Sequence, residues 1–131
     1  MGFVEYKLKS FKDDKGGLTP IEFVNFCDFS PKRIYTVYES EGKTRGGHAH
    51  LVEEELFFMS NGSCTGRFHD GIQWFEVRLT ANENLVYVPV MLWHEFCDFS
   101  AGAVLVAVSS TIYNSDRSDY IEDFDNFLSN V

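Results

Sequence analysis

The chain has 131 residues, of which 44% are hydrophobic and 16% aromatic, so it can bury a core and is not a disordered tail. Its formal net charge of −9 argues against a general nucleic-acid surface, although a few convergent arginines could still hold one anionic ligand. No stretch approaches the roughly 18 consecutive apolar residues of a membrane helix, and the N-terminus lacks the apolar stretch of a signal peptide. We therefore expect one cytoplasmic domain over residues 1–131, with no nucleic-acid or membrane partner.

Short apolar runs separated by Gly, Asn, Asp and Pro indicate a sandwich or barrel of β-strands. The Asp70-Gly71 pair between two of these runs predicts a tight hairpin, because such pairs tolerate the positive φ angles of two-residue turns. In chain order, the expected strands are Val4–Phe11, Leu18–Phe23, Arg33–Glu39, Gly47–Ala49, Glu54–Asn61, Ser63–His69, Ile72–Leu79, Asn84–Val88, His94–Phe99 and Ala103–Ser109.

Only the C-terminal segment has a helical pattern. Apolar residues at positions 120, 121, 124, 127 and 128 form a stripe of helical period, and Ser118 precedes it as a suitable N-cap. The pattern predicts a short helix over residues 118–128 whose apolar face docks on the barrel.

Two histidines stand out in the segment Gly46-Gly47-His48-Ala49-His50. Residues i and i+2 of a strand project to the same face, so His48 and His50 should lie side by side. Their spacing from Gly42, Glu55 and Gly62 matches the first motif of the cupin superfamily in every fixed position. The sequence therefore resembles those of the cupin superfamily, which implies a cupin-type β-barrel, or jelly roll, here with a short C-terminal helix.

The second cupin motif is degraded. Pro89 and His94 have the expected separation, but Glu83, Met91 and Asp98 replace the expected glycines and asparagine. His48, His50, Glu55 and His94 could nevertheless converge as three imidazoles and a carboxylate, a set that suits Mn, Fe, Ni or Zn. A metal site therefore stays open on residue chemistry alone.

The chain also resembles a narrower family, the sugar-nucleotide 3,4-ketoisomerases, over roughly residues 3 to 128. The most specific elements are Arg45-Gly46-Gly47-His48-Ala49-His50 and Trp93-His94-Glu95, and further elements are Lys32-Arg33-Ile34-Tyr35, Asn61-Gly62-Ser63, Asp98-Phe99-Ser100 and Asp119-Tyr120-Ile121. The resemblance implies an isomerase of dTDP-4-keto-6-deoxyglucose that serves the synthesis of amino sugars for bacterial surface glycans such as lipopolysaccharide.

The resemblance further implies that the enzyme needs no metal or other cofactor. It also implies a homodimer in which an N-terminal strand is exchanged between subunits. Two positions depart from the family pattern: Leu51 replaces a frequent lysine, and Glu55 replaces a frequent glutamine. Because a metal would occupy the imidazole lone pairs that acid–base catalysis needs, we expect Glu55 to accept a hydrogen bond from an imidazole instead.

Such a reaction needs a base that titrates near neutrality, and imidazole meets this need. We expect His50 to take the proton at sugar carbon C3, with His48 as its partner and Tyr35 as a second acid. Arg33 and Arg45 are the candidates for the diphosphate, since guanidinium forms bidentate pairs with phosphate oxygens. Tyr87, Trp93 and His94 are expected to line the same cavity, although Trp93 could equally pack in the core.

The remaining polar candidates have simpler interpretations. His69, beside the predicted hairpin, is expected to be exposed, and Arg67 and Arg78 are expected on solvent faces. Two other functions stay open: a metal-dependent cupin enzyme of the dioxygenase kind, and a non-catalytic sugar-nucleotide-binding module. Retention of both histidines argues against pure binding, because binding alone does not need two groups that titrate near neutrality.

Overall fold

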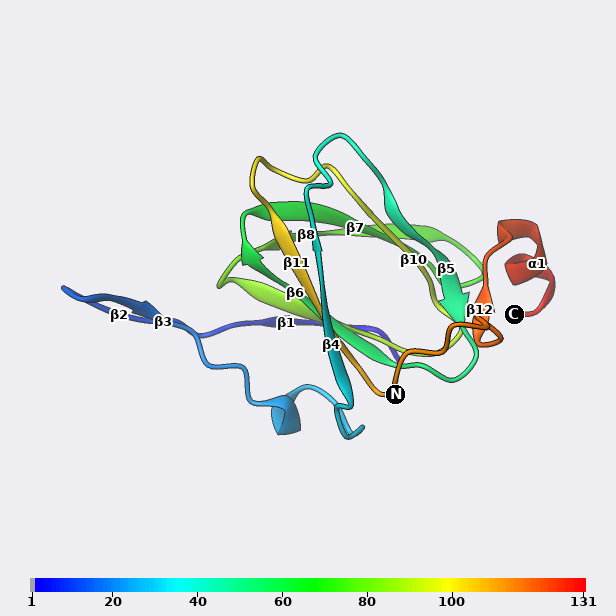
Figure 1. Cartoon of the computed structure of the whole chain (residues 1–131), viewed down its shortest axis with the longest axis horizontal. Helices are drawn as coiled ribbons and strands as arrows, with labels where there is room; N and C mark the ends of the chain where they lie inside the picture. The colour runs from blue at the N-terminus through cyan, green and yellow to red at the C-terminus, as the bar shows by residue number, and fades with distance from the viewer. Residues whose placement is uncertain (1) are drawn as a thin grey trace.

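The computed structural model describes residues 2–131 as an all-β body of two antiparallel five-stranded sheets with one short helix (Figure 1). One sheet has the order β1-β9-β6-β11-β4 and the other the order β12-β5-β10-β7-β8. The bounds are β1 Val4–Lys7, β4 Arg33–Tyr38, β5 Arg45–His50, β6 Glu55–Asn61, β7 Ser63–His69, β8 Trp74–Thr80, β9 Asn84–Val88, β10 Trp93–Cys97, β11 Val104–Ser109 and β12 Tyr120–Ile121.

The main core lies between the two sheets. Phe57 of β6 and Leu105 of β11 meet Phe68 of β7 and Phe96 of β10 there, all at most 3% exposed. Alternation along each strand brings these side chains to the inner faces. The expected all-β barrel with a short C-terminal helix is confirmed, and eight of its predicted strands match observed ones within two residues at each end.

The first two predicted strands are wrong in extent. The strand expected over Val4–Phe11 ends at Lys7, because its partner β9 begins at Asn84, opposite Lys7. The strand expected over Leu18–Phe23 is absent beyond Leu18, and a 3₁₀ turn, η1, covers Phe23–Asn25. Pro20 explains the loss, since proline has no N–H for a ladder and restricts the residue before it.

The predicted hairpin exists, but its turn is longer than two residues. His69 pairs with Trp74, so four residues connect β7 and β8. The Asp70 carboxylate accepts the N–H groups of Ile72 and Gln73, and only Gly71 of the Asp-Gly pair has a positive φ, 99°. Asp70 therefore stabilises the turn through its side chain.

The C-terminal helix is shorter than predicted. The helix α1 covers Phe124–Ser129, and Asp123 caps it by accepting the Asn126 N–H, whereas Ser118 does not. Tyr120 and Ile121 instead form β12, which pairs with His50 and Ala49 at the edge of β5. Hydrogen bonding to an open sheet edge overrides the local helical pattern here.

The prediction that His69 is exposed is wrong, and helix α1 explains why. The ring is only 7% exposed, because Phe124 and Phe127 of the helix and Trp74 of β8 surround it. Arg78 is exposed as expected. None of the helices within residues 2–131 is long and apolar enough to cross a membrane.

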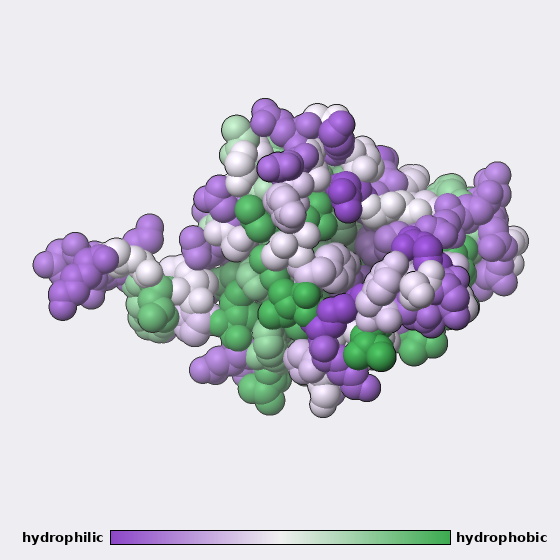
Figure 2. All heavy atoms as spheres, in the orientation of Figure 1, coloured by the Kyte–Doolittle hydropathy of each residue, from purple (hydrophilic) through white to green (hydrophobic). Residues whose placement is uncertain are grey.

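Strands β2 (Phe11–Asp13) and β3 (Gly16–Leu18) form a separate hairpin that projects from the body (Figure 1). Its tip is hydrophilic and more hydrophobic surface lies towards its base (Figure 2). The side chains of Phe11 and Leu18 are 52% and 62% exposed. Within residues 2–131 no further strand pairs with this hairpin, and an isolated two-stranded hairpin is at best marginally stable in water.

Candidate active site

Strand β5 places the two histidines as the alternation predicts. His48 and His50 share one side of the strand, while Ala49 is fully buried on the other side against Trp93 and Phe127. Gly46 has a φ of 85°, and a Cβ at this position would lie 3.0 Å from the carbonyl oxygen of His94. A glycine is therefore required for β5 to approach β10 this closely.

This approach brings His94 of β10 opposite His48 and creates a cluster of three imidazoles, the histidine cluster His48, His50 and His94. The ring centroids are 4.7 Å apart for His48 and His50, 4.8 Å for His48 and His94, and 5.5 Å for His50 and His94. His94 donates its Nδ1–H to the carbonyl oxygen of Leu92 at 3.0 Å, which leaves a lone pair on Nε2.

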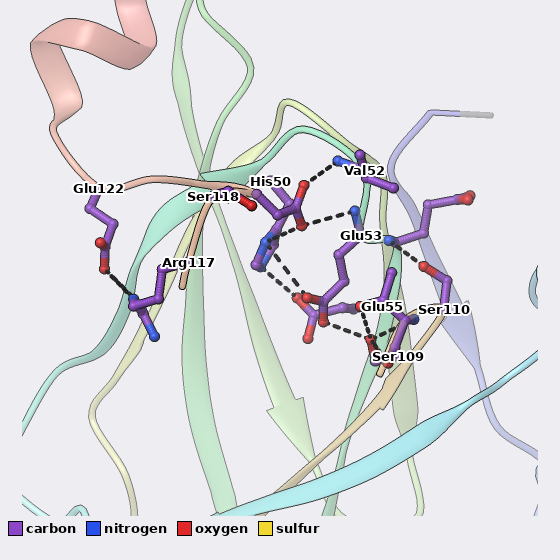
Figure 3. Close-up of polar contacts among 12 residues, drawn as sticks. His50, Val52, Glu53, Glu55, Ser109, Ser110, Arg117, Ser118 and Glu122 are labelled. Atoms are coloured by element: carbon purple, nitrogen blue, oxygen red, sulfur yellow. Dashed lines mark hydrogen bonds and ion pairs between the residues drawn. The ribbon is translucent and has the colours of Figure 1, made fainter. Parts of the chain in front are cut away.

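A fully buried carboxylate, Glu55 of β6, lies behind the cluster. Its Oε2 accepts the hydroxyl of Tyr35 at 2.5 Å, and its Oε1 lies 3.3 Å from Nε2 of His50 and 3.6 Å from Nε2 of His94 (Figure 3 shows Glu55 and His50). Glu55 thus connects Tyr35 to two of the three imidazoles.

The other ring nitrogen of His50 faces a second carboxylate. Nδ1 lies 3.1 Å from Oδ2 of Asp119, the residue before β12. Sequence reasoning did not select Asp119 as a site residue, because the predicted helix covered it. Its place in the family-like Asp119-Tyr120-Ile121 element was the available signal.

The surroundings separate the acid–base properties of the three histidines. Burial lowers the pKa of His48 to about 2, with further lowering by the neighbouring His94 and His50. Burial also lowers the pKa of His94. For His50, burial is the largest influence and acts downwards, but Glu55, Glu53 and Asp119 together outweigh it and raise the pKa. His50 is therefore the most basic imidazole of the cluster, while His48 stays neutral.

The cluster borders a cavity of about 570 Å³. His48 and His94 line it, whereas His50, at 2% exposure, and Glu55 lie behind the lining. The other lining residues are Arg33, Tyr35, Val37, Thr44, Arg45, Gly46, Phe57, Phe96, Leu105, Tyr113, Arg117 and Tyr120. The volume suits a small organic ligand.

Three arginines, the arginine group Arg33, Arg45 and Arg117, bring positive charge to this cavity of an acidic protein. Arg33 pairs with Glu53 at 2.8 Å, and Arg117 pairs with Glu122 at 2.7 Å. Within residues 2–131, Arg45 forms no ion pair and is exposed. Arg45 is therefore the cation most available to an anionic ligand. Arg117 was missed at the sequence level, since nothing local distinguishes it from a solvent-exposed arginine.

Two predicted cavity residues lie elsewhere. Tyr87 packs on the outer side of its sheet against Leu56 and Phe29, and its hydroxyl donates to Glu54. Trp93 packs beneath α1 against Phe127, which agrees with the core alternative for this residue. Neighbouring strand residues point to opposite faces, so a cavity-facing His94 places Trp93 on the other side.

Arg67, expected on a solvent face, lies outside the cavity with its side chain 36% exposed. It stacks on Trp74 and pairs with Glu95 at 2.6 Å.

The donor set is chemically suited to a divalent metal. Ligand atoms of His48, His50 and His94 lie within 4.8 Å of one another, and Glu55 Oε1 and His94 Nε2 are buried without a hydrogen-bond partner. Three imidazoles with a carboxylate fit Zn, Fe or Mn. The expectation that activity needs no metal therefore stays a prediction.

Comparison with known proteins places this site in a family of enzymes. Residues 2–131 match the family model described as FdtA, WxcM-like, C-terminal, and the chain belongs to this family. A curated relative, TDP-4-oxo-6-deoxy-alpha-D-glucose-3,4-oxoisomerase of Aneurinibacillus thermoaerophilus, is 37% identical over 128 residues, which cover 95% of this chain and 91% of the relative.

Solved structures agree with this assignment. A 3,4-ketoisomerase from Helicobacter canadensis superposes with a TM-score of 0.88 at 31% identity, covering 98% of this chain and 96% of the other. A histidine-to-asparagine mutant of a 3,4-ketoisomerase from Thermoanaerobacterium thermosaccharolyticum, in complex with TDP-4-keto-6-deoxyglucose, superposes with a TM-score of 0.85 at 27% identity, covering 98% and 92%. The predicted resemblance to the 3,4-ketoisomerases and the cupin-type fold are confirmed.

Proposed function

We propose that this protein is a 3,4-ketoisomerase that moves the carbonyl of a dTDP-linked 4-keto-6-deoxyhexose from C4 to C3, for the synthesis of 3-amino-3,6-dideoxy sugars. The observation that carries the proposal is the histidine cluster on the cavity, in which one imidazole is made basic by carboxylates and another is kept neutral. The curated relative is a TDP-4-oxo-6-deoxy-alpha-D-glucose-3,4-oxoisomerase, and the mutant Thermoanaerobacterium thermosaccharolyticum ketoisomerase holds TDP-4-keto-6-deoxyglucose in its crystal.

The reaction is a balanced transfer of two protons with no external oxidant. The C3–H bond breaks and its electron pair forms the C3=C4 bond of an enediolate, while the C4 carbonyl oxygen becomes negative and is protonated. The C3 hydroxyl then loses its proton and becomes the carbonyl, and C4 receives a proton. A base and an acid near neutrality suffice for every step.

His50 is the proposed base at C3, and its ring lies just behind the cavity lining, next to His48. Its raised pKa gives it the highest proton affinity in the cluster, and the imidazolium formed would have Glu55 at 3.3 Å and Asp119 at 3.1 Å. Among residues 2–131, Glu55 Oε1 has no hydrogen-bond partner before the reaction, so it is free to accept the new N–H. A carboxylate placed where charge develops stabilises the transition state.

His48 is the proposed partner that meets the sugar oxygens. It lines the cavity, and its lowered pKa keeps the ring neutral, so one nitrogen can accept a hydrogen bond from a sugar hydroxyl while the other donates one. Tyr35, whose pKa is raised by burial and by Glu55, stays protonated; its one hydrogen is donated to Glu55 in the resting protein and has to turn from Glu55 to reach the developing oxyanion.

The diphosphate is assigned to Arg45 and Arg33. Arg45 has the free guanidinium, while Arg33 is held by Glu53 and stacks on Tyr35 and Tyr113. Arg33 therefore contributes a fixed positive charge, and Arg45 can form the direct bidentate contact.

A homodimer that exchanges its N-terminal hairpin is part of the proposal. Strand β1 pairs with β9 of its own chain, so the element free for exchange is the β2–β3 hairpin. Edge strand β4 also exposes Ile34 and Tyr38, 61% and 60% accessible. A second copy that receives the hairpin would cover such apolar groups.

The decisive experiment supplies the purified protein with dTDP-4-keto-6-deoxyglucose in D₂O. We expect deuterium at C4 of a 3-keto product. A matching aminotransferase should convert this product to a 3-amino sugar, and NMR shows both results. Binding of the sugar nucleotide without deuterium incorporation would instead identify a binding module. Sedimentation analysis tests the dimer, and deletion of residues 11–18 should give monomers.

A further inference from the structure

The carboxylate of Asp119 occupies an anchored position beside His50. Its Oδ1 accepts the N–H of Val52 at 2.5 Å, and its Oδ2 accepts the N–H of Glu53 at 3.2 Å. The backbone carbonyl of Asp119 also accepts the Leu51 N–H at 2.9 Å. Two backbone amides of the loop after β5 thus hold the carboxylate in place whether or not His50 contacts it.

We propose that Asp119 is the positioning residue of His50: it accepts the Nδ1–H of the ring and leaves Nε2 as the atom that takes the proton from the substrate. The contact of 3.1 Å between Nδ1 and Asp119 Oδ2 is the shortest polar contact of the His50 ring. This inference rests on the proposed function, in which His50 is the base.

The other acceptor near Nδ1 is already engaged. Glu53 Oε1 lies 3.7 Å from Nδ1, beyond hydrogen-bond distance, and its Oε2 accepts from Arg33 at 2.8 Å and from Ser109 at 2.7 Å. Asp119 therefore selects the tautomer, because a carboxylate can only accept a hydrogen bond and so requires the hydrogen on Nδ1.

The Glu55 carboxylate competes for hydrogen at Nε2, 3.3 Å away, but it forms no hydrogen bond there, whereas the Asp119 contact is a hydrogen bond, so hydrogen on Nδ1 is favoured. Glu55 of β6 faces Nε2, and the rings of His48, His94 and Tyr120 contact the imidazole through their own edges and faces. With hydrogen on Nδ1, the Nε2 lone pair faces Glu55, which in turn contacts the cavity-lining Tyr35.

Asp119→Asn tests the inference, because asparagine keeps the size but removes the charge and can donate to Nδ1. In the free protein, ¹⁵N NMR of the His50 ring should show hydrogen on Nδ1 in the wild type and a shift towards hydrogen on Nε2 in the variant. A fall in kcat of at least about 10-fold, and up to about 10⁴-fold as when asparagine replaces the carboxylate of a catalytic triad, is expected with little change in KM.

The pH profile separates positioning from a structural role. Since the negative charge of Asp119 contributes to the raised pKa of His50, the acid limb of kcat/KM should move to lower pH in Asp119→Asn. Asp125→Asn, an exposed carboxylate on α1, is the matched control and should leave the profile and kcat unchanged. Thermal melting establishes that both variants are folded.

The outcomes are distinct. An unchanged tautomer and an unchanged acid limb in a folded Asp119→Asn protein would overturn the inference, even if kcat fell. A wild-type protein that shows the Nδ1–H tautomer but no isomerase activity would overturn the proposed function and leave the role of Asp119 in orienting His50 intact.

Discussion

The histidine cluster and the arginine group border one cavity, but the charges next to the imidazoles are negative and those of the arginine group are positive. Carboxylates of Glu55, Glu53 and Asp119 surround His50 behind the lining, whereas the arginine group brings three positive charges to the lining itself. Negative charge near the imidazoles favours proton capture, and positive charge favours an anionic ligand. The difference separates chemistry from binding, so substitutions in one group should change kcat and those in the other should change affinity.

The largest expected effect is that of His50→Asn. Asparagine cannot accept a proton near neutral pH, so kcat should fall by roughly 10² to 10⁴, the usual contribution of a general base. Affinity for dTDP, measured by calorimetry, should stay within about twofold, since the arginines are intact. His69→Asn is the control: it replaces another buried histidine, should lower the melting temperature and should leave kcat unchanged. More than about a tenth of wild-type activity in His50→Asn would reject the base assignment.

Glu55→Gln should have a smaller effect, with a characteristic pH dependence. The neutral form of His50 becomes available only as the pH rises through its raised pKa, so kcat/KM of the wild type should rise with pH on the acid side. Removal of the Glu55 charge lowers that pKa, so the acid limb should move to lower pH while kcat falls roughly 10- to 100-fold.

Two measurements complete the Glu55 test. Rate profiles between pH 5 and 9, a window of about two units on each side of neutrality, cover the acid limb. Glu76→Gln changes an exposed carboxylate on β8, 60% accessible, and should leave the profile unchanged. A Glu55→Gln limb at higher pH than in the wild type would contradict the electrostatic account.

Arg45→Ala should weaken binding rather than chemistry. Loss of a charge-assisted contact costs about 1.5 kcal/mol at the low end of the range, which applies because Arg45 is exposed, and this corresponds to roughly tenfold in Kd. Calorimetry with dTDP measures the change, and kcat at saturating substrate should stay close to the wild-type value. Arg78→Ala, an exposed arginine outside the cavity, is the control. Unchanged dTDP affinity would move the diphosphate to Arg33 or Arg117.

Removal of metal should have the smallest effect. The His48 and His50 lone pairs serve proton transfer in the proposed mechanism, so protein stripped with EDTA and verified by elemental mass spectrometry should keep full activity. Loss of activity that one divalent ion restores would show instead that the histidine cluster acts as a metal site.

The sequence predicted the body of the fold and the centre of the site, because both depend on local patterns. Alternation placed His48 and His50 on one face, and the motif spacing brought Glu55 and His94 to them. It failed where tertiary contacts decide: Tyr120 and Ile121 pair with the β5 edge instead of forming a helix. Asp119 was missed for the same reason, since only this pairing brings its carboxylate to His50.

The errors at Tyr87 and Trp93 have another origin. Both are aromatic residues in strands next to the site, and residue type alone does not determine which face of a sheet a side chain occupies. A one-residue difference in register moves a side chain from the cavity to the opposite surface. The register of β9 and β10 is set by their pairing with β6 and β7.

The close contact between Gly46 and the His94 carbonyl limits how this enzyme can acquire new substrates. The spacing of β5 and β10 is determined by a backbone contact, because residue 46 has no room for a Cβ. Side-chain changes selected for bulkier sugars therefore cannot separate these two strands. Additional space must come from the apolar part of the lining, at Val37 and Leu105, where smaller residues enlarge the cavity without displacing an imidazole. Selection for substrate scope should therefore accumulate changes on β4 and β11 and retain the sequence of β5.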